Sequence, residues 1–180
     1  MSNREESNPL GLSAIFGDQA EPLQLFNLWY EEAGGSEPND PSAFALATAD
    51  ANGKPNVRML LLKGASEGGF AFYTNINSRK AEELRENPQA SMCFHWKHLR
   101  RQIRICGSVT PVSDAEADSY FASRDHDSRV VAWASLQSSS MAFRADLHQR
   151  LAKLQSSSSQ GLEVPRTLHC FRCGETEERF

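Results

Sequence analysis

The chain has 180 residues, enough for one domain that buries roughly 70% of the surface exposed by its unfolded form. It is 39% apolar and 23% charged, and no stretch approaches the roughly 18 uninterrupted apolar residues of a membrane-spanning helix, so no transmembrane protein is predicted. The net charge is −4, yet residues 54–104 carry ten Lys or Arg against four Asp or Glu, which favours a small phosphorylated ligand over a nucleic acid.

The first forty residues predict a polar tail followed by one helix. Residues 22–32 place Leu, Phe, Trp and Tyr side chains close to helical spacing. Residues 34–41 read GGSEPNDP, a composition typical of a loop. Because residues 1–18 contain early acids and no apolar run behind a basic start, we expect no secretory signal and a cytoplasmic protein.

Five short strands are predicted after this loop, over residues 42–49, 57–63, 70–74, 90–96 and 102–112. The Asn-Gly pair within residues 50–53 favours a hairpin between the first two strands. Residues 64–69, GASEGG, predict another turn. Short strands joined by tight turns indicate a mainly β fold, an antiparallel barrel or sandwich with peripheral helices.

Three helices are predicted beside the strands, over residues 78–87, 115–124 and 141–154. Ser78 is the expected N-cap of the first helix, and Ser113 with Glu116 forms a capping box ahead of the second. Residues 155–161 are Ser-rich and predicted to be flexible, and the residues after them show no clear period.

The cysteine and histidine patterns give weak signals. Four cysteines, unevenly spread, do not make a disulfide framework, so reduced thiols are expected. Residues 169–173 contain one Cys-x-x-Cys beside a His, which is half a zinc site; no metal site is predicted, and the role of Cys170 and Cys173 stays open. Residues 124–129, RDHDSR, predict a solvated connecting loop, with a metal or acid–base role for His126 as the less favoured alternative.

Two basic residues lie near the start of the helix predicted over residues 78–87. Arg79 and Lys80 lie in its first turn, where free amide groups and the positive end of the helix dipole attract anions and disfavour cations. A bound phosphate would resolve this conflict. The alternative, favoured on this feature alone, is that both side chains extend into solvent.

The second strand carries two further cations on opposite faces. Arg58 has apolar neighbours and therefore requires a partner. Lys63 has the opposite strand parity, which fits two alternatives: it contacts a different ligand group, or it simply ends the strand. Near the fifth strand, Arg100, Arg101, Gln102 and Arg104 fit a functional role and an edge-strand role against aggregation equally well.

Several of these segments, taken in register, resemble pyridoxamine 5′-phosphate oxidases across residues 40 to 140. They are RMLLLK (58–63), FYTN (72–75), SRK (78–80), RQIRI (101–105), YFASR (120–124) and WASLQS (133–138). The resemblance implies a split β-barrel that forms a homodimer with flavin mononucleotide (FMN) at the subunit interface. It also implies a phosphorylated B6 vitamer as the small-molecule substrate, without nucleic acid or membrane partners.

The resemblance further implies site residues. Arg58, Arg79 and Lys80 look like contacts to the FMN phosphate and flavin. The other implied FMN contacts are Met59, Leu60, Leu61, Leu62, Lys63, Tyr73, Thr74, Gln102, Gln137 and Ser138. The implied substrate-phosphate contacts are Lys63, Tyr120, Arg124 and Ser128. In such enzymes the flavin accepts a hydride from the carbon that becomes the aldehyde of pyridoxal 5′-phosphate, and oxygen reoxidises it to give hydrogen peroxide.

The carboxyl-terminal part departs from the family pattern. The expected Trp-Gly-Gly is replaced by His-Cys-Phe-Arg (169–172), and the closing segment with its Arg-x-His motif has no counterpart, so no catalytic residue is assigned. We expect one or two barrel strands to be missing and the active site to be open. The predicted divisions are residues 1–40 (tail and helix), 41–154 (FMN-binding barrel with helices) and 155–180 (flexible, divergent tail).

Two hypotheses about function therefore remain from the sequence. The first is an FMN-dependent oxidase of pyridoxamine or pyridoxine 5′-phosphate. The alternative is an FMN- or pyridoxal-phosphate-binding protein without turnover, favoured by the absent Arg-x-His. An RNA-binding barrel is disfavoured by the net acidity and by the absence of a clear aromatic stacking platform.

Overall fold

The computed structural model describes residues 21–135, 137–138, 143–157, 168–174 and 177–179. Its strands are β1 (Ala43–Ala49), β2 (Pro55–Ser66), β3 (Gly69–Asn75), β4 (Gln89–Trp96), β5 (Arg101–Pro111), β6 (Leu168–Cys173) and β7 (Glu177–Arg179). Its helices are α2 (Pro22–Ser36), α3 (Arg79–Glu86), α4 (Asp114–Ser123), α5 (His126–Ala134) and α6 (Arg144–Ser157). None of the helices in these ranges combines the length and apolar character that a bilayer crossing requires.

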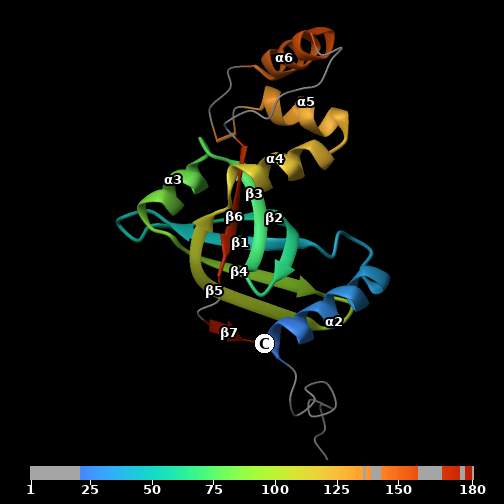
Figure 1. Cartoon of the computed structure of the whole chain (residues 1–180), viewed down its shortest axis with the longest axis vertical. Coiled ribbons are helices and arrows are strands. Elements are labelled where there is room, and N and C mark those ends of the chain that lie inside the picture. Colours follow the sequence, from blue (N-terminus) through green and yellow to red (C-terminus); the bar gives the residue numbers. More distant parts are fainter. Residues whose placement is uncertain (1–20, 136, 139–142, 158–167, 175–176, 180) are drawn as a thin grey trace, which may run out of the picture.

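Six of these strands form a closed antiparallel barrel (Figure 1). Hydrogen bonding follows the order β4-β1-β2-β3-β6-β5, and β5 pairs again with β4 to complete the ring. The short strand β7 adds to β5 alongside Arg104–Cys106. Helices α4, α5 and α6 gather at one end of the molecule and α2 at the other (Figure 1). The predicted mainly β barrel with peripheral helices is confirmed.

The turn between β1 and β2 has the predicted hairpin form. Asp50 Oδ1 accepts hydrogen bonds from the backbone N–H groups of Asn52, at 2.9 Å, and Lys54, at 3.0 Å. Gly53 has φ +78°, a backbone conformation that residues other than glycine rarely adopt. The Asn-Gly pair therefore fixes the register in which Leu46 faces Arg58 across the two strands.

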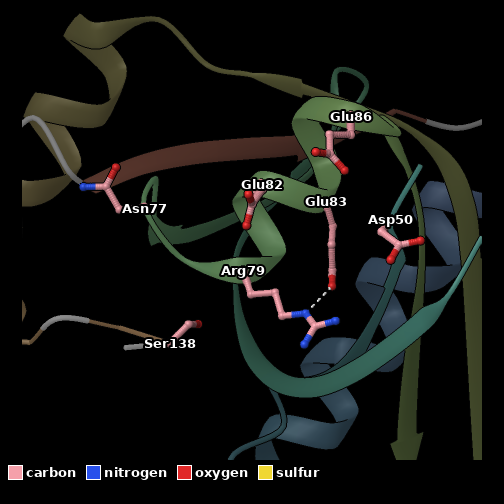
Figure 2. Close-up of a pocket in the computed structure, with 7 residues that line it drawn as sticks. All are labelled: Asp50, Asn77, Arg79, Glu82, Glu83, Glu86 and Ser138. Carbon is pink, nitrogen blue, oxygen red and sulfur yellow. Dashed lines mark hydrogen bonds and ion pairs between the residues drawn. The ribbon is translucent and has the colours of Figure 1, made fainter. Parts of the chain in front are cut away.

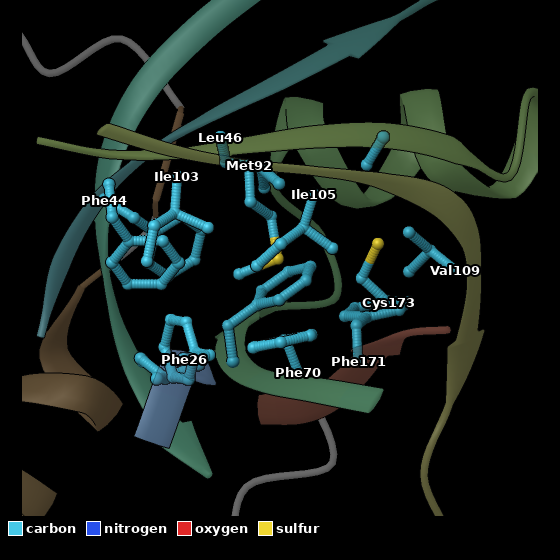
Figure 3. Packing of buried hydrophobic residues seen from close by; sticks show 14 of the residues in the cluster. Phe26, Phe44, Leu46, Phe70, Met92, Ile103, Ile105, Val109, Phe171 and Cys173 are labelled. Carbon is cyan, nitrogen blue, oxygen red and sulfur yellow. The ribbon is translucent and has the colours of Figure 1, made fainter. Parts of the chain in front are cut away.

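The barrel interior is filled by every second side chain of its strands (Figure 3). Phe44 and Leu46 of β1 and Ile103 and Ile105 of β5 are almost completely buried, while the residues between them are less so. This period of two is the consequence of strand geometry when one face packs on a core. The labelled members of the core are Phe26, Phe44, Leu46, Phe70, Met92, Ile103, Ile105, Val109, Phe171 and Cys173.

Helix α2 closes the end of the barrel opposite α4–α6. The Phe26 ring packs edge-on against Phe70, with centroids 4.9 Å apart, and against Phe94, at 5.2 Å. The Arg101 guanidinium lies 4.6 Å from the Trp29 ring centroid and forms an ion pair with Glu32 of the same helix. Arg101 therefore anchors α2 to β5.

Helix α2 also extends further than predicted. It continues to Ser36, so it includes Gly34 and Gly35, which the sequence places in a loop. The Ala33 side chain is completely buried, and the Ala33 carbonyl accepts the backbone N–H of Glu37. Packing on the barrel thus outweighs the low helix propensity of two glycines.

Strand β6 corrects the expectation of a flexible carboxyl-terminal tail with missing strands. It lies between β3 and β5, with Cys170 opposite Tyr73 and Cys173 opposite Val109. The side chains of Cys170 and Cys173 are fully buried and that of Phe171 nearly so. Because this strand has only six residues, two of them the basic residues His169 and Arg172, its sequence shows too little alternation to predict it.

Residues 126–134 form helix α5 where a solvated loop was predicted over residues 124–129. The Asp125 carboxylate caps the helix by accepting the backbone N–H of Ser128 at 2.8 Å. The first four residues of α5, His126 to Arg129, are all polar, so the sequence gives no apolar periodicity from which the start of the helix could be predicted. At the next helix upstream, the predicted cap is confirmed: the Ser113 hydroxyl accepts the backbone N–H of Glu116 at 3.2 Å.

Two further boundaries differ from prediction. Strand β2 continues through Gly64–Ser66, which were expected in a turn, because these residues pair with β3 after a register shift next to Leu62. Helix α6 spans Arg144–Ser157 and not residues 141–154; residues 141–142 lie outside the described part. The first three residues of the predicted Ser-rich segment 155–161 therefore belong to this helix.

Candidate functional site

A buried lysine lies at the first turn of α3, among neutral oxygen atoms. The Lys80 side chain is only 5% exposed. Its Nζ donates hydrogen bonds to Thr74 Oγ1 at 3.0 Å, Ser78 Oγ at 3.3 Å and Gln137 Oε1 at 2.9 Å. Among the described residues it forms no ion pair. We call Thr74, Ser78, Lys80 and Gln137 the Lys80 cluster.

This arrangement changes the role expected for Ser78. Ser78 is the N-cap residue of α3 by position, yet its hydroxyl accepts no backbone hydrogen bond. It is completely buried and faces Lys80 and Thr74 instead. The first turn of α3 therefore keeps its free N–H groups, and the buried ammonium stands close to them.

The environment of Lys80 disfavours its charge. Burial, and then the nearby Arg58 guanidinium, lower the Lys80 pKa to about 8, although the Glu83 carboxylate partly opposes the shift. Buried ammonium groups are costly unless an opposite charge compensates them. The Lys80 cluster therefore has the chemistry of an anion site that neutral oxygens only partly satisfy.

Glu83, one turn further along α3, is the partner that Arg58 requires. The buried Glu83 Oε2 accepts Thr48 Oγ1 at 2.5 Å and Arg58 Nη2 at 3.3 Å. Its Oε1 accepts Asn56 Nδ2 at 2.5 Å and Arg79 Nε at 3.0 Å, the last contact being drawn in Figure 2. Burial alone would raise the Glu83 pKa, but these hydrogen bonds and the Arg58 charge hold it below its usual value.

The charges of the Lys80 cluster and of the ion pairs at Glu83, counted without the other carboxylates nearby, do not cancel. Arg58, Arg79 and Lys80 supply three positive charges, and Glu83 supplies one negative charge. A phosphate dianion would balance the remainder, so the residues fit a phosphate-bearing cofactor. The adjacent cavity of about 440 Å³ shown in Figure 2 has a different character, since four carboxylates line it beside Arg79. An anion is therefore expected on the Lys80 side of Arg79 and not in that cavity.

A second cavity, of about 630 Å³, opens between β2, β3 and the α4–α5 connection; we call it the Lys63 groove. The structure brings all four predicted substrate-phosphate residues to it. Its lining consists of Met59, Leu60, Leu61, Lys63, Tyr73, Tyr120, Ser123, Arg124, Asp125 and Ser128. Lys63 and Arg124 give it two cations from different elements, which suits a phosphate.

Two stacked tyrosines form part of the Lys63 groove. The rings of Tyr73 and Tyr120 are nearly parallel, with centroids 3.5 Å apart. Burial raises the pKa of both phenols, and for Tyr73 the Cys170 thiol adds to the effect. Both groups therefore stay neutral near pH 7 and can donate hydrogen bonds.

Cys170 supports this tyrosine pair from β6. Burial raises the pKa of the Cys170 thiol to about 11, and the same cause raises that of Cys173 to about 11. Thiols that stay protonated are poor nucleophiles and poor metal ligands. The two cysteines whose role the sequence left open lie buried in the barrel as free thiols.

The remaining residues predicted to contact FMN do not all lie at the Lys80 cluster or in the Lys63 groove. Leu62 is buried in the core, and Ser138 lines the cavity beside Arg79 with φ +66°. Gln102 lies on the exposed face of β5 opposite His95, and its side chain lines neither cavity described above. No group of three or more metal-ligating side chains occurs within the ranges that the structure describes.

Sequence reasoning missed Glu83 and two of its hydrogen-bond partners, Thr48 and Asn56. Glu83 could have been found from its i, i+4 spacing with Arg79, which pairs opposite charges on a helix face. Thr48 and Asn56 carry no comparable signal. They face each other on β1 and β2 next to the turn, and they reach Glu83 only because α3 packs against these strands.

The chain was compared with known proteins. Residues 33–156 match the family model described as pyridoxamine 5′-phosphate oxidase. The pyridoxine/pyridoxamine 5′-phosphate oxidase of Rhodospirillum rubrum is 54% identical over 157 residues, covering 84% of this chain and 78% of the relative. That of Pelagibacter ubique is 48% identical over 164 residues, covering 91% and 79%.

Solved structures agree with these relatives. PhzG from Burkholderia lata 383, in complex with tetrahydrophenazine-1-carboxylic acid, superposes with a TM-score of 0.84 and 28% identity, covering 90% of this chain and 80% of that one. A pyridoxamine 5′-phosphate oxidase-related, FMN-binding protein from Nostoc punctiforme superposes with a TM-score of 0.72, covering 89% and 84%; at 17% identity it supports the fold alone. The motifs, the barrel and the matched relatives together show that the chain belongs to the pyridoxamine 5′-phosphate oxidase family.

Proposed function

We propose that this protein is an FMN-dependent oxidase that converts pyridoxamine or pyridoxine 5′-phosphate to pyridoxal 5′-phosphate with oxygen as acceptor. One observation carries the proposal: two sets of cationic side chains, each suited to bind a phosphate, lie beside two consecutive residues of β3. Thr74 belongs to the Lys80 cluster, and Tyr73 lines the Lys63 groove. A reaction between a phosphorylated cofactor and a phosphorylated substrate requires two such groups near each other.

The Lys80 cluster with Arg58 and Arg79 is the proposed holder of the FMN phosphate. Its charge balance and its buried, incompletely compensated ammonium support this assignment. Beyond this cluster, which includes the predicted contacts Thr74 and Gln137, the other proposed FMN contacts are Met59, Leu60, Leu61, Leu62, Lys63, Tyr73, Gln102 and Ser138. When bound, the flavin supplies a hydride acceptor, and the protein contributes binding, orientation and charge.

The Lys63 groove is the proposed substrate site. Lys63 and Arg124 would bind the substrate phosphate, and the hydroxyls of Tyr120 and Ser128 would complete its hydrogen bonds. Because Tyr120 and Arg124 both come from the α4 end of the groove, they fix the phosphate there. The rest of the substrate then extends along β2 toward Met59.

We also propose a homodimer formed through the outer face of β2. Val57, Met59 and Leu61 alternate along this face and are 70%, 64% and 40% exposed. A row of three exposed apolar side chains on a strand is costly in water and is typical of an interface. Sedimentation equilibrium of the FMN-loaded protein should give the mass of two chains; the mass of one chain with FMN bound would contradict this interface.

The function is tested by the visible spectrum of FMN-loaded, dialysed protein under anaerobic conditions. Adding pyridoxine 5′-phosphate should bleach a retained flavin band. In the Arg124→Ala variant the band should be retained, but the pyridoxine 5′-phosphate concentration for half-maximal bleaching should rise roughly tenfold, since a charge-assisted contact to phosphate is lost. Arg150→Ala, which removes an exposed arginine of α6, is the matched control and should behave as the wild type.

Three outcomes distinguish the possibilities. A retained band that does not bleach contradicts the oxidase and supports a flavin-binding protein without turnover. Loss of FMN from Arg124→Ala contradicts the separation of the two phosphate sites. Bleaching that is equally efficient in wild type and Arg124→Ala contradicts the proposed substrate site.

A further inference from the structure

We propose that Glu83 is a positioning residue for the cofactor phosphate: it holds the guanidinium groups of Arg58 and Arg79, so that selection of FMN over riboflavin depends on this carboxylate. The inference rests on the proposed function, because it concerns the same phosphate site. Glu83 is not expected to touch the cofactor. It acts through two cations that are proposed to do so.

The first support is the convergence of several elements on one buried carboxylate. Glu83 is 2% exposed and accepts hydrogen bonds from Thr48 of β1, Asn56 and Arg58 of β2, and Arg79 of its own helix. A surface ion pair would not need so many partners. The carboxylate therefore ties the start of α3 to the β1–β2 hairpin at a fixed distance.

The second support is the way each guanidinium is held. Arg58 Nη1 donates to the Leu46 carbonyl at 3.1 Å and to Thr48 Oγ1 at 2.6 Å, and Nη2 donates to Glu83. Arg79 uses only Nε toward Glu83, and its two terminal amino groups have no hydrogen-bond partner among the described residues (Figure 2). Glu83 thus fixes one edge of each guanidinium and leaves other N–H groups for a ligand.

Two physical effects of Glu83 on a bound phosphate have opposite signs. As a negative charge it repels the phosphate, so its removal alone would tighten FMN binding. As an anchor it restrains two long side chains that would otherwise lose conformational freedom on binding, so its removal would weaken FMN binding. The buried position and the four donors favour the anchor effect, and one substitution decides between the two.

The experiment compares FMN with riboflavin, which carries the same ring but no phosphate. Affinities for both are measured by quenching of flavin fluorescence in wild type and Glu83→Gln. We expect the ratio of FMN to riboflavin affinity to fall roughly tenfold in Glu83→Gln while riboflavin affinity stays unchanged. Glu82→Gln removes the same charge from an exposed neighbour on the same helix and should leave the ratio at or slightly above that of the wild type.

A second variant covers the case in which Glu83→Gln does not fold. Thr48→Val removes the hydroxyl that joins Arg58 to Glu83 and keeps the carboxylate. It should lower the ratio in the same direction by a smaller factor, with folding checked by circular dichroism. An unchanged or increased ratio in the folded Glu83→Gln, or in Thr48→Val if Glu83→Gln is unfolded, overturns the positioning role. A wild-type protein that binds FMN no better than riboflavin contradicts the phosphate site itself, and hence the proposed function.

Discussion

Lys80→Met is expected to weaken FMN binding roughly ten- to hundredfold, which corresponds to about 1.5–3 kcal/mol for one charge-assisted contact to phosphate. Methionine keeps most of the side-chain volume and removes the ammonium group. Because the Lys80 side chain is buried among neutral oxygens, no other cation can take its place without moving α3. Fluorescence quenching with FMN measures the loss directly.

The matched control is Lys54→Met, which removes an exposed lysine beside the β1–β2 turn. Its FMN affinity should equal that of the wild type. Riboflavin affinity should change little in either variant, since riboflavin lacks the phosphate. Wild-type FMN affinity in Lys80→Met would remove the Lys80 cluster from the phosphate site.

The same variant has a pH signature in the ligand-free protein. The Lys80 pKa is lowered to about 8 by burial, whereas an unfolded chain has a lysine pKa near 10.4. Between these values the unfolded state binds more protons than the folded state, so the free energy of unfolding rises with pH in this window. The difference in unfolding free energy between wild type and Lys80→Met should therefore grow in favour of the wild type from about pH 8 to pH 10.4. Urea titrations across this range measure it, and a pH-independent difference would show that Lys80 has an ordinary pKa.

Phe26→Ala is expected to lower the free energy of unfolding by about 3–5 kcal/mol, the usual cost of removing a buried aromatic ring. The Phe26 side chain is 1% exposed and contacts Phe70 of β3 and Phe94 and Trp96 of β4. Its loss leaves a cavity where α2 meets the barrel. Urea unfolding of the ligand-free protein gives the value.

Leu28→Ala is the control for this prediction. Leu28 lies two residues away on the same helix but is 62% exposed, so its truncation should change the free energy of unfolding by less than about 0.5 kcal/mol. Equal effects of the two substitutions would mean that α2 is not packed on the barrel through Phe26.

Much of the site could be predicted because its residues carry local signals. Arg79 and Lys80 stand at a helix start, and strand parity places Arg58 and Lys63 on opposite faces of β2, as the structure shows. What could not be predicted is that Glu83, one turn from Arg79 on the same helix, also compensates Arg58. Glu83 stands among other charged residues in the sequence, and only the fold buries it between α3 and the β1–β2 hairpin.

The carboxyl-terminal strand illustrates the same limit. In the sequence, His-Cys-Phe-Arg-Cys looked like a divergent segment or half a metal site. In the structure it completes the barrel, and Arg172 forms an ion pair at 2.6 Å with Glu116 of α4, the helix that carries Tyr120. A six-residue strand gains its stability from hydrogen bonds to β3 and β5, which are distant in the sequence.

The sequence by itself determined most of the elements and the family of this protein. Alternating apolar residues, one Asn-Gly turn and several motifs in register are local properties, and each follows from the geometry of a strand, a turn or a helix end. The tertiary structure alone decided which charges meet. It brings Glu83 to Arg58 and Arg79, gathers Lys63 with Tyr120 and Arg124, and seats β6 between β3 and β5. These contacts join residues far apart in the chain, and burial changes their energies in ways that no local pattern records.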